Sequence, residues 1–147
     1  MPKTLLLVED HPIVAALEQR QLARLGYQVI HAPSGERAVA EVRAKAGRID
    51  LILMDIDLGP GMDGVEAARI ITDEYDIPVI FLSSHAEREV VERTAQVPCC
   101  GYVLKSSGVA GLDAAIRAAF AHRDDNAAFG ADDDALPGSD ASSPLDR

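Results

Sequence analysis

The fold is decided by residues 49–64, which read IDLILMDIDLGPGMDG. Four apolar residues of the kind found in a strand buried on both faces end abruptly at Asp55, with Asp57 two residues later. Three glycines and a proline then predict a loop, and Asp63 with Glu66 forms a capping box that predicts the start of a helix. The stretch therefore predicts a βα unit with an acid at its tip. If Asp55 is considered alone, the simpler interpretation is an exposed acid at a strand end that has no function.

Length and composition indicate one compact domain, because domains of about 100 to 150 residues are the commonest and the chain has 147 residues. No apolar run approaches the ~18 residues of a membrane span, and no signal peptide is visible, so we expect a cytoplasmic chain without membrane contact. The formal net charge of −10 argues against nucleic acid as a direct partner. Cys99 and Cys100 are adjacent, so neither a zinc site nor a disulfide follows from them.

The last part of the sequence predicts a disordered acidic tail. Residues 123–147 hold seven acids and two bases with hardly a large apolar side chain, a composition that cannot offset the entropy of ordering. We therefore expect a folded domain over residues 1–122 and a tail over residues 123–147. A tail of this kind cannot build a second effector domain.

Strands and helices alternate along the rest of the chain. Further strands are predicted at residues 5–8, 28–31, 79–82 and 102–104, with the more polar 28–31 at a sheet edge. Helices are predicted at residues 12–25, 34–46 and 63–75, from Ser84 to a stop at Pro98, and from a cap at Ser106 or Ser107 to about residue 122. Five strands alternating with five helices predict a parallel sheet covered on both faces.

Side chains capable of chemistry follow four of the five predicted strands, and the edge strand alone carries none. They are Glu9 and Asp10, Asp55, Ser83, and Lys105. The carboxyl ends of parallel strands meet at one edge, where such sheets bind ligands. Lys105 is one of only three lysines against eleven arginines, which favours a need for a compact ammonium at that position.

The acids predict a divalent cation. Two carboxylates ~4 Å apart repel by about 4 kcal/mol at an effective dielectric constant of 20, and a cation relieves this. An all-oxygen donor set, completed by a backbone carbonyl from the loop after Asp55, favours Mg²⁺, or Mn²⁺, over zinc. An aspartate beside such a cation, the Ser83 hydroxyl and the Lys105 ammonium is suited to phosphoryl transfer onto a carboxylate.

Over residues 4–121 the sequence resembles the CheY-like receiver domains of two-component response regulators. The family's acidic pair matches Glu9 and Asp10, its phosphorylated aspartate matches Asp55, its Ser/Thr and following small residue match Ser83 and Ser84, its lysine matches Lys105, and its switch aromatic matches Tyr102. The resemblance implies a flavodoxin-like, doubly wound, five-stranded parallel sheet of strand order 2-1-3-4-5. It also implies a phosphoprotein of a phosphorelay, which takes a phosphoryl group on Asp55 from a sensor histidine kinase or a phosphotransfer protein. Self-phosphorylation and autodephosphorylation are then its only reactions, so it is not an enzyme in the ordinary sense.

The same resemblance implies roles for further residues. Metal binding would involve Asp10, Asp55 and the backbone carbonyl of Asp57, with Glu9 in support, while Asp57, Ser84 and His85 would tune autodephosphorylation. Tyr102 and Ser83 would switch the face formed by the fourth helix, the fifth strand and the last helix. Output would pass to an unidentified downstream protein, to a second copy of the chain on phosphorylation, or onward with the phosphoryl group. The sequence identifies neither the kinase nor the target.

Two features depart from the family pattern. The loop at residues 57–64 is one residue longer than usual, which bears on the approach to the metal. Ser106 replaces the proline that usually follows the lysine in a cis bond, so the sequence leaves open whether the bond after Lys105 is cis or trans.

Two other functions stay open. A haloacid-dehalogenase-like phosphatase would also use the pattern of Asp55 and Asp57 with a downstream serine and lysine, but in that family the strand bearing this pattern comes first. An interaction module that keeps the fold without phosphorylation is the other. The presence of all the family's motifs argues against it.

Overall fold

The fold was analysed in a computed structural model that describes residues 2–58, 61–84, 92 and 101–133. The strands are β1 (Thr4–Val8), β2 (Gln28–Ala32), β3 (Leu51–Asp55), β4 (Val79–Ser83) and β5 (Gly101–Leu104). The helices are α1 (Pro12–Arg24), α2 (Gly35–Lys45), α3 (Gly64–Glu74) and α5 (Gly108–Asp133), with 3-10 turns at Ala46–Arg48 and Lys105–Ser107. Of the helix expected between Ser84 and Pro98, all residues but Ser84 and Glu92 fall outside the described part of the chain.

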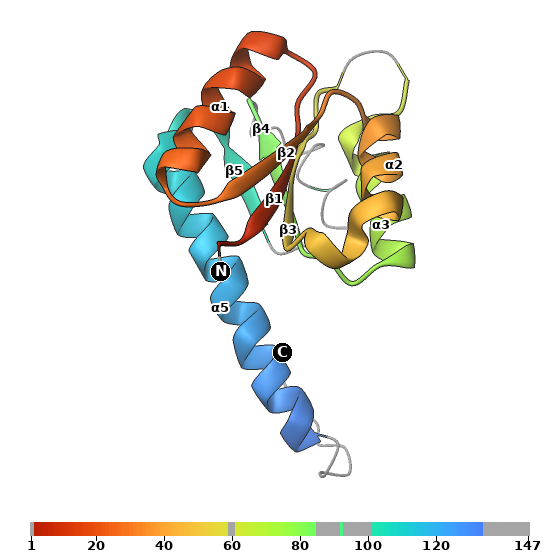
Figure 1. Cartoon of the computed structure of the whole chain (residues 1–147), viewed down its shortest axis with the longest axis vertical. Coiled ribbons are helices and arrows are strands. Elements are labelled where there is room, and N and C mark those ends of the chain that lie inside the picture. The colour runs from red at the N-terminus through yellow and green to blue at the C-terminus, as the bar shows by residue number, and fades with distance from the viewer. Residues whose placement is uncertain (1, 59–60, 85–91, 93–100, 134–147) are drawn as a thin grey trace. The chain divides into compact units, whose positions relative to one another are not determined.

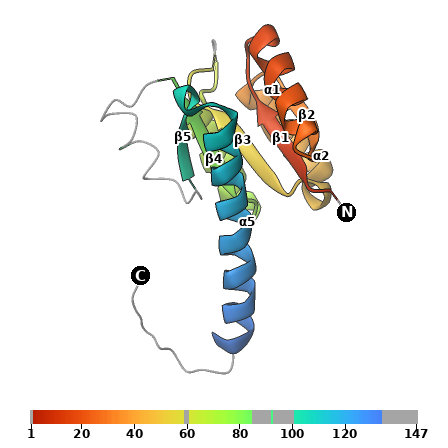
Figure 2. The same ribbon diagram turned by 90° about the vertical axis from the view of Figure 1, so that its left-hand side faces the viewer.

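The five strands form one parallel sheet in the order β2-β1-β3-β4-β5. Figure 2 shows this order running from β5 to β2. The predicted flavodoxin-like order is confirmed, and β2 lies at an edge as expected. Pairing continues past the end of β1, because the Glu9 N–H donates to the Ala32 carbonyl at 3.1 Å. The carboxyl ends of the strands therefore meet at one edge of the sheet.

Side chains alternate between the two faces of the sheet. Leu6, Ile52 and Met54 belong to an apolar cluster with α2 and α3, which lie together on one side of the sheet in Figure 1, opposite α1. The intervening residues, such as Leu7 and Leu53, point toward the α1 side and are equally buried. Near-continuous apolar strands are typical of a sheet covered on both faces.

The helix starts follow from local hydrogen bonds. Asp63 Oδ1 accepts from the Glu66 N–H at 2.9 Å and Glu66 Oε1 accepts from the Asp63 N–H at 3.2 Å, so the predicted capping box is confirmed. The Ser34 hydroxyl accepts from the Arg37 N–H at 3.1 Å at the start of α2. In α1, Pro12 occupies the first turn, where its missing N–H costs no hydrogen bond.

The last helix differs from the prediction at both ends. Ser106 and Ser107 form a 3-10 turn rather than its cap, with the Ser107 hydroxyl donating to the Leu104 carbonyl at 2.7 Å, and the helix begins at Gly108. It continues to Asp133, past the predicted end near residue 122, because alanines are good helix formers and lengthening an existing helix is easy. Residues 134–147 of the expected tail fall outside the described residues. No described helix is long and apolar enough to span a membrane.

The chain divides into two compact units, Met1–Ala115 and Ile116–Arg147. The sheet, helices α1 to α3 and the first residues of α5 belong to the first unit. Every residue of the site described next belongs to it as well.

Candidate functional site

An acidic cluster lies at the carboxyl edge of the sheet. Glu9 and Asp10 follow β1, Asp55 ends the neighbouring strand β3, and these three residues offer carboxylate oxygens within 4.8 Å of one another. Glu9 is 2% and Asp55 3% exposed, while Asp10 faces solvent. The predicted meeting of these three acids is confirmed by the geometry. Such a set of oxygen donors fits Mg²⁺, which prefers carboxylates and retains water on its open side.

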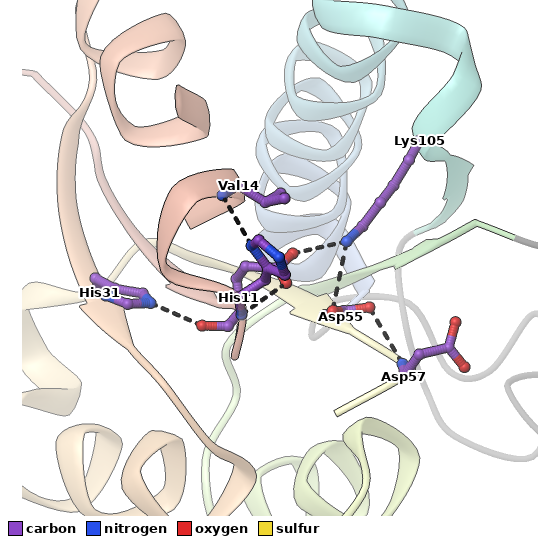
Figure 3. A network of polar contacts seen from close by, with 7 residues as sticks. His11, Val14, His31, Asp55, Asp57 and Lys105 are labelled. Atoms are coloured by element: carbon purple, nitrogen blue, oxygen red, sulfur yellow. Dashed lines mark hydrogen bonds and ion pairs between the residues drawn. The ribbon is translucent and has the colours of Figure 1, made fainter. Parts of the chain in front are cut away.

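Lys105 places an ammonium between the two buried carboxylates. Its Nζ donates to Glu9 Oε1 at 2.6 Å and lies 3.4 Å from Asp55 Oδ2. Figure 3 shows the side chain descending from the end of β5 toward Asp55. The bond between Lys105 and Ser106 is trans, so the lysine reaches the site without the cis bond of the family pattern.

The charge state of Asp55 reflects its surroundings. Burial raises the pKa of Asp55, the Glu9 carboxylate raises it further, and the Lys105 ammonium and the Asp57 N–H lower it, with the net result that the pKa is raised to about 7. The Asp57 N–H donates to Asp55 Oδ1 at 3.1 Å. The two carboxylate oxygens of Asp55 thus differ: Oδ1 is fixed by the backbone, and Oδ2 faces the lysine.

Lys105 stays charged in this environment. Burial lowers the pKa of Lys105, but its hydrogen bond to Glu9 and the charges of Asp55, Glu9 and Glu18 outweigh burial and raise the pKa overall. Glu18, on α1, therefore belongs to the electrostatic surroundings of the site, although the sequence analysis gave it no role.

Two histidines hold the backbone and side chain around Glu9. His31 Nε2 lies 2.8 Å from the Glu9 carbonyl oxygen, and the His11 N–H donates to Glu9 Oε2 at 3.2 Å. His31 belongs to β2, the edge strand to which the sequence analysis assigned no site residue. Its place at the predicted strand end was the signal that could have identified it.

The remaining predicted site residues lie at neighbouring positions. Ser83 ends β4, is fully buried and pairs in register with Leu104. Tyr102 is partly buried and packs against the apolar cluster on the α2 and α3 side. Asp57 and Ser84 are exposed, and His85 lies outside the described residues.

The loop after Asp55 is held at both of its described ends. The Met62 N–H donates to Glu36 Oε2 at 3.0 Å, next to Gly61 in the left-handed region with φ of 101°. At Gly64, a Cβ would overlap the Asp55 carbonyl oxygen, so only glycine lets α3 begin this close to the strand end. Gly59 and Pro60, within the longer loop, fall outside the described residues.

A parallel sheet of this strand order with an acidic cluster and a lysine at its carboxyl edge is the arrangement expected of an α/β receiver domain. The family model of the response regulator receiver domain matches residues 5–117, and the chain belongs to this family. It is therefore a receiver domain of two-component signalling. The phosphatase alternative finds no support in the comparisons.

Several relatives illustrate the match. The transcriptional regulatory protein CseB of Streptomyces coelicolor is 38% identical over 113 residues, which cover 77% of this chain and 47% of CseB. The response regulator GacA of Pseudomonas viridiflava is 35% identical over 119 residues, covering 79% of this chain and 54% of GacA. The chain thus spans about half the length of these curated relatives.

Two solved structures share the fold at moderate identity. The N-terminal domain of a response regulator/sensory box/GGDEF protein from Carboxydothermus hydrogenoformans is 40% identical, with a TM-score of 0.78 over 85% of this chain and 99% of that one. The BeF₃-activated receiver domain of RstA from Klebsiella pneumoniae is 29% identical, with a TM-score of 0.72 over 78% and 96% of the two chains.

Proposed function

We propose that Asp55 accepts a phosphoryl group from the phosphohistidine of a sensor histidine kinase or a phosphotransfer protein. The observation that carries the proposal is the Lys105 ammonium between two buried carboxylates, 3.4 Å from Asp55 Oδ2. This arrangement places a compact positive charge beside an acid whose pKa is raised to about 7. A raised pKa indicates that the charged form of a carboxylate is destabilised by its surroundings. A nearby cation, or a reaction that changes this charge, then stabilises the site.

Each residue of the site has its own role in the phosphoryl transfer. Asp55 Oδ2 attacks phosphorus and forms the new P–O bond, while the P–N bond to the donor imidazole breaks and its electron pair stays on that nitrogen. The Asp57 N–H keeps Oδ1 in place, so Oδ2 is the oxygen presented to the donor. Lys105 and the Ser83 hydroxyl then bind oxygens of the transferred group.

Asp10, Asp55 and the backbone carbonyl of Asp57, with Glu9 in support, would hold Mg²⁺, or Mn²⁺ in its place. When bound, the cation would supply positive charge that balances the acids and the incoming phosphoryl group. Three carboxylates with oxygens within 4.8 Å support this assignment. Hydrolysis of the phosphorylated Asp55 by water, tuned by Asp57, Ser84 and His85, completes the proposal.

The proposed output follows from Ser83 and Tyr102. Movement of Ser83 toward the phosphoryl group would make room for Tyr102, which lies on the adjacent strand β5. This would alter a surface that binds a downstream protein or a second copy of the chain. The proposal keeps the cytoplasmic location expected from the sequence.

Acetyl phosphate with Mg²⁺ tests the acceptor. We expect the full chain to gain one phosphoryl group, detected by intact mass and removed by hydroxylamine, as an acyl phosphate should be. Asp55→Asn should gain none, whereas Asp73→Asn, which removes an exposed carboxylate on α3, should behave as the wild type. Label that persists in Asp55→Asn would refute the assignment. Steady hydrolysis of p-nitrophenyl phosphate would favour the phosphatase alternative instead.

A further inference from the structure

Glu18 is a carboxylate on the covered side of α1. Ala15 and Leu22 are the buried residues of this helix, and a helix returns to one face every three or four residues, which places Glu18 between them. Its Oε1 atom is buried, and within the described part of the chain it has no hydrogen-bond partner. Burial raises the pKa of Glu18, while Lys105 lowers it and Glu9 raises it. A partly buried carboxylate with an unpaired oxygen needs a physical explanation.

Glu18 and Lys105 line the same cavity, of about 250 Å³. The other lining residues are apolar or uncharged, among them Val14, Leu82 and Val103. Of the described residues around this cavity, Lys105 is the only cation. Apolar walls strengthen electrostatic interactions, so the two charges act on each other across the space.

The alternation of side chains along the strands explains why Lys105 and Glu18 line the same cavity. Leu82 pairs in register with Asp55 on one side and with Val103 on the other, so all three point to the same face of the sheet. Two residues after Val103, Lys105 leaves the sheet on that face, and α1 covers the same face with Glu18. The sheet pleat thus brings Lys105 and Glu18 to the same side as the acceptor.

Lys105 now pairs with Glu9 and Asp55 and, among the described residues, not with Glu18. A divalent cation held by the acidic cluster would place two positive charges beside this ammonium, and like charges repel. The lysine side chain is long and flexible, and the cavity gives its end group room to move away from the cluster.

We propose that Glu18 is a positioning residue that receives the Lys105 ammonium when a divalent cation occupies the acidic cluster. The inference rests on the metal site of the proposed function. Moving to Glu18 leaves Asp55 Oδ2 open to attack phosphorus, yet keeps the ammonium in the cavity that Lys105 and Glu18 both line. Glu18 thereby favours cation binding without contacting the cation.

The test compares Glu18→Gln, which keeps the size and shape of the side chain, with Asp73→Asn, which makes the same charge change on the exposed face of α3. Mg²⁺ affinity is measured by NMR titration of the full chain, and folding is checked from the amide spectrum. We expect Glu18→Gln to weaken Mg²⁺ binding by roughly three- to tenfold, the scale of a partly buried charge pair. Asp73→Asn should bind as the wild type does.

A second readout follows the lysine directly. The chain has three lysines, so the ¹³Cε and ¹⁵Nζ signals of Lys105 can be assigned by substitution of the other two. In the wild type, Mg²⁺ should shift the Lys105 signals strongly, and Glu18→Gln should lose most of that shift. In a Lys105→Ala background, Glu18→Gln should no longer change Mg²⁺ affinity.

Three results would overturn the inference, and one of them also removes the metal site. Wild-type affinity and a full Lys105 shift in Glu18→Gln would show that Glu18 does not receive the ammonium. If Glu18→Gln weakened Mg²⁺ binding equally in the wild-type and Lys105→Ala backgrounds, Glu18 would act on the cation only through its own negative charge and not through Lys105. Absence of Mg²⁺ binding by the wild type would refute the proposed metal site, and this inference with it.

Discussion

The two faces of the sheet share the same strands but carry different side chains. On the α2 and α3 face, residues such as Ile52 and Phe81 belong to a continuous apolar cluster. The α1 face is equally apolar in its middle, but Glu9, Asp55 and Lys105 gather at its carboxyl edge. Burying charges is costly even when they are paired, because the desolvation penalty can exceed the attraction within the pair. The α2 and α3 face therefore supplies stability that the site at the edge of the α1 face reduces. The strand pleat separates the two, because Met54 and its neighbour Asp55 point to opposite sides.

The largest effect should come from the apolar face. Phe81→Ala removes the largest fully buried side chain among the described residues and should lower the free energy of unfolding by about 3–5 kcal/mol through lost burial and a cavity. Urea unfolding measures it. Leu17→Ala, on α1 and 55% exposed, is the control and should cost less than about 1 kcal/mol. Similar losses for the two variants would contradict the assignment of Phe81 to the buried apolar cluster of this face.

An intermediate effect of opposite sign is expected at the charged edge. The pKa of Asp55 is raised from its ordinary value of 3.8 to about 7. Between these two pH values the Asp55 carboxyl is ionised in the unfolded chain but still protonated in the folded one, so without metal the free energy of unfolding falls as the pH rises from about 4 to 7. Asp55→Asn removes that cost but also the pair with Lys105. We expect it to raise the free energy of unfolding at pH 8 by about 2 kcal/mol, less than the ~4 kcal/mol that three pKa units would give.

Urea unfolding in EDTA at pH 4, 6 and 8 measures this gain. It should be close to zero at pH 4 and grow toward pH 8. Asp57→Asn, an exposed change two residues away, should show no such trend. An Asp55→Asn variant less stable than the wild type at pH 8 would mean that the lysine pair outweighs burial.

The sequence predicted the acidic cluster and Lys105 because apolar runs mark strand ends, and a parallel sheet brings those ends to one edge. Glu18 could not be found in the same way. Ile13 and Leu17 of α1 are 75% and 55% exposed, while Glu18 is partly buried on the side of Leu22, so at these three positions the helix departs from the amphipathic pattern. The face a helix covers is fixed by packing, which the sequence of that helix alone does not contain. The trans bond after Lys105 and the contacts of the Lys105 side chain likewise depend on tertiary packing, and only the structure shows them.

The smallest effect is expected where charge lies outside the core. Arg43 on α2 donates to both carboxylate oxygens of Glu74 on α3, at 3.2 and 2.8 Å, but both side chains are largely exposed and the pair is weakened by water and salt. Arg43→Ala should therefore lower the melting temperature by no more than about 2 °C at low salt. Because the screening length falls from about 10 Å at 0.1 M salt to about 3 Å at 1 M, even this difference should disappear at 1 M NaCl, whereas the loss in Phe81→Ala should persist. A large, salt-independent loss in Arg43→Ala would show that stability on this face also depends on charge, and the contrast between the two faces would fail.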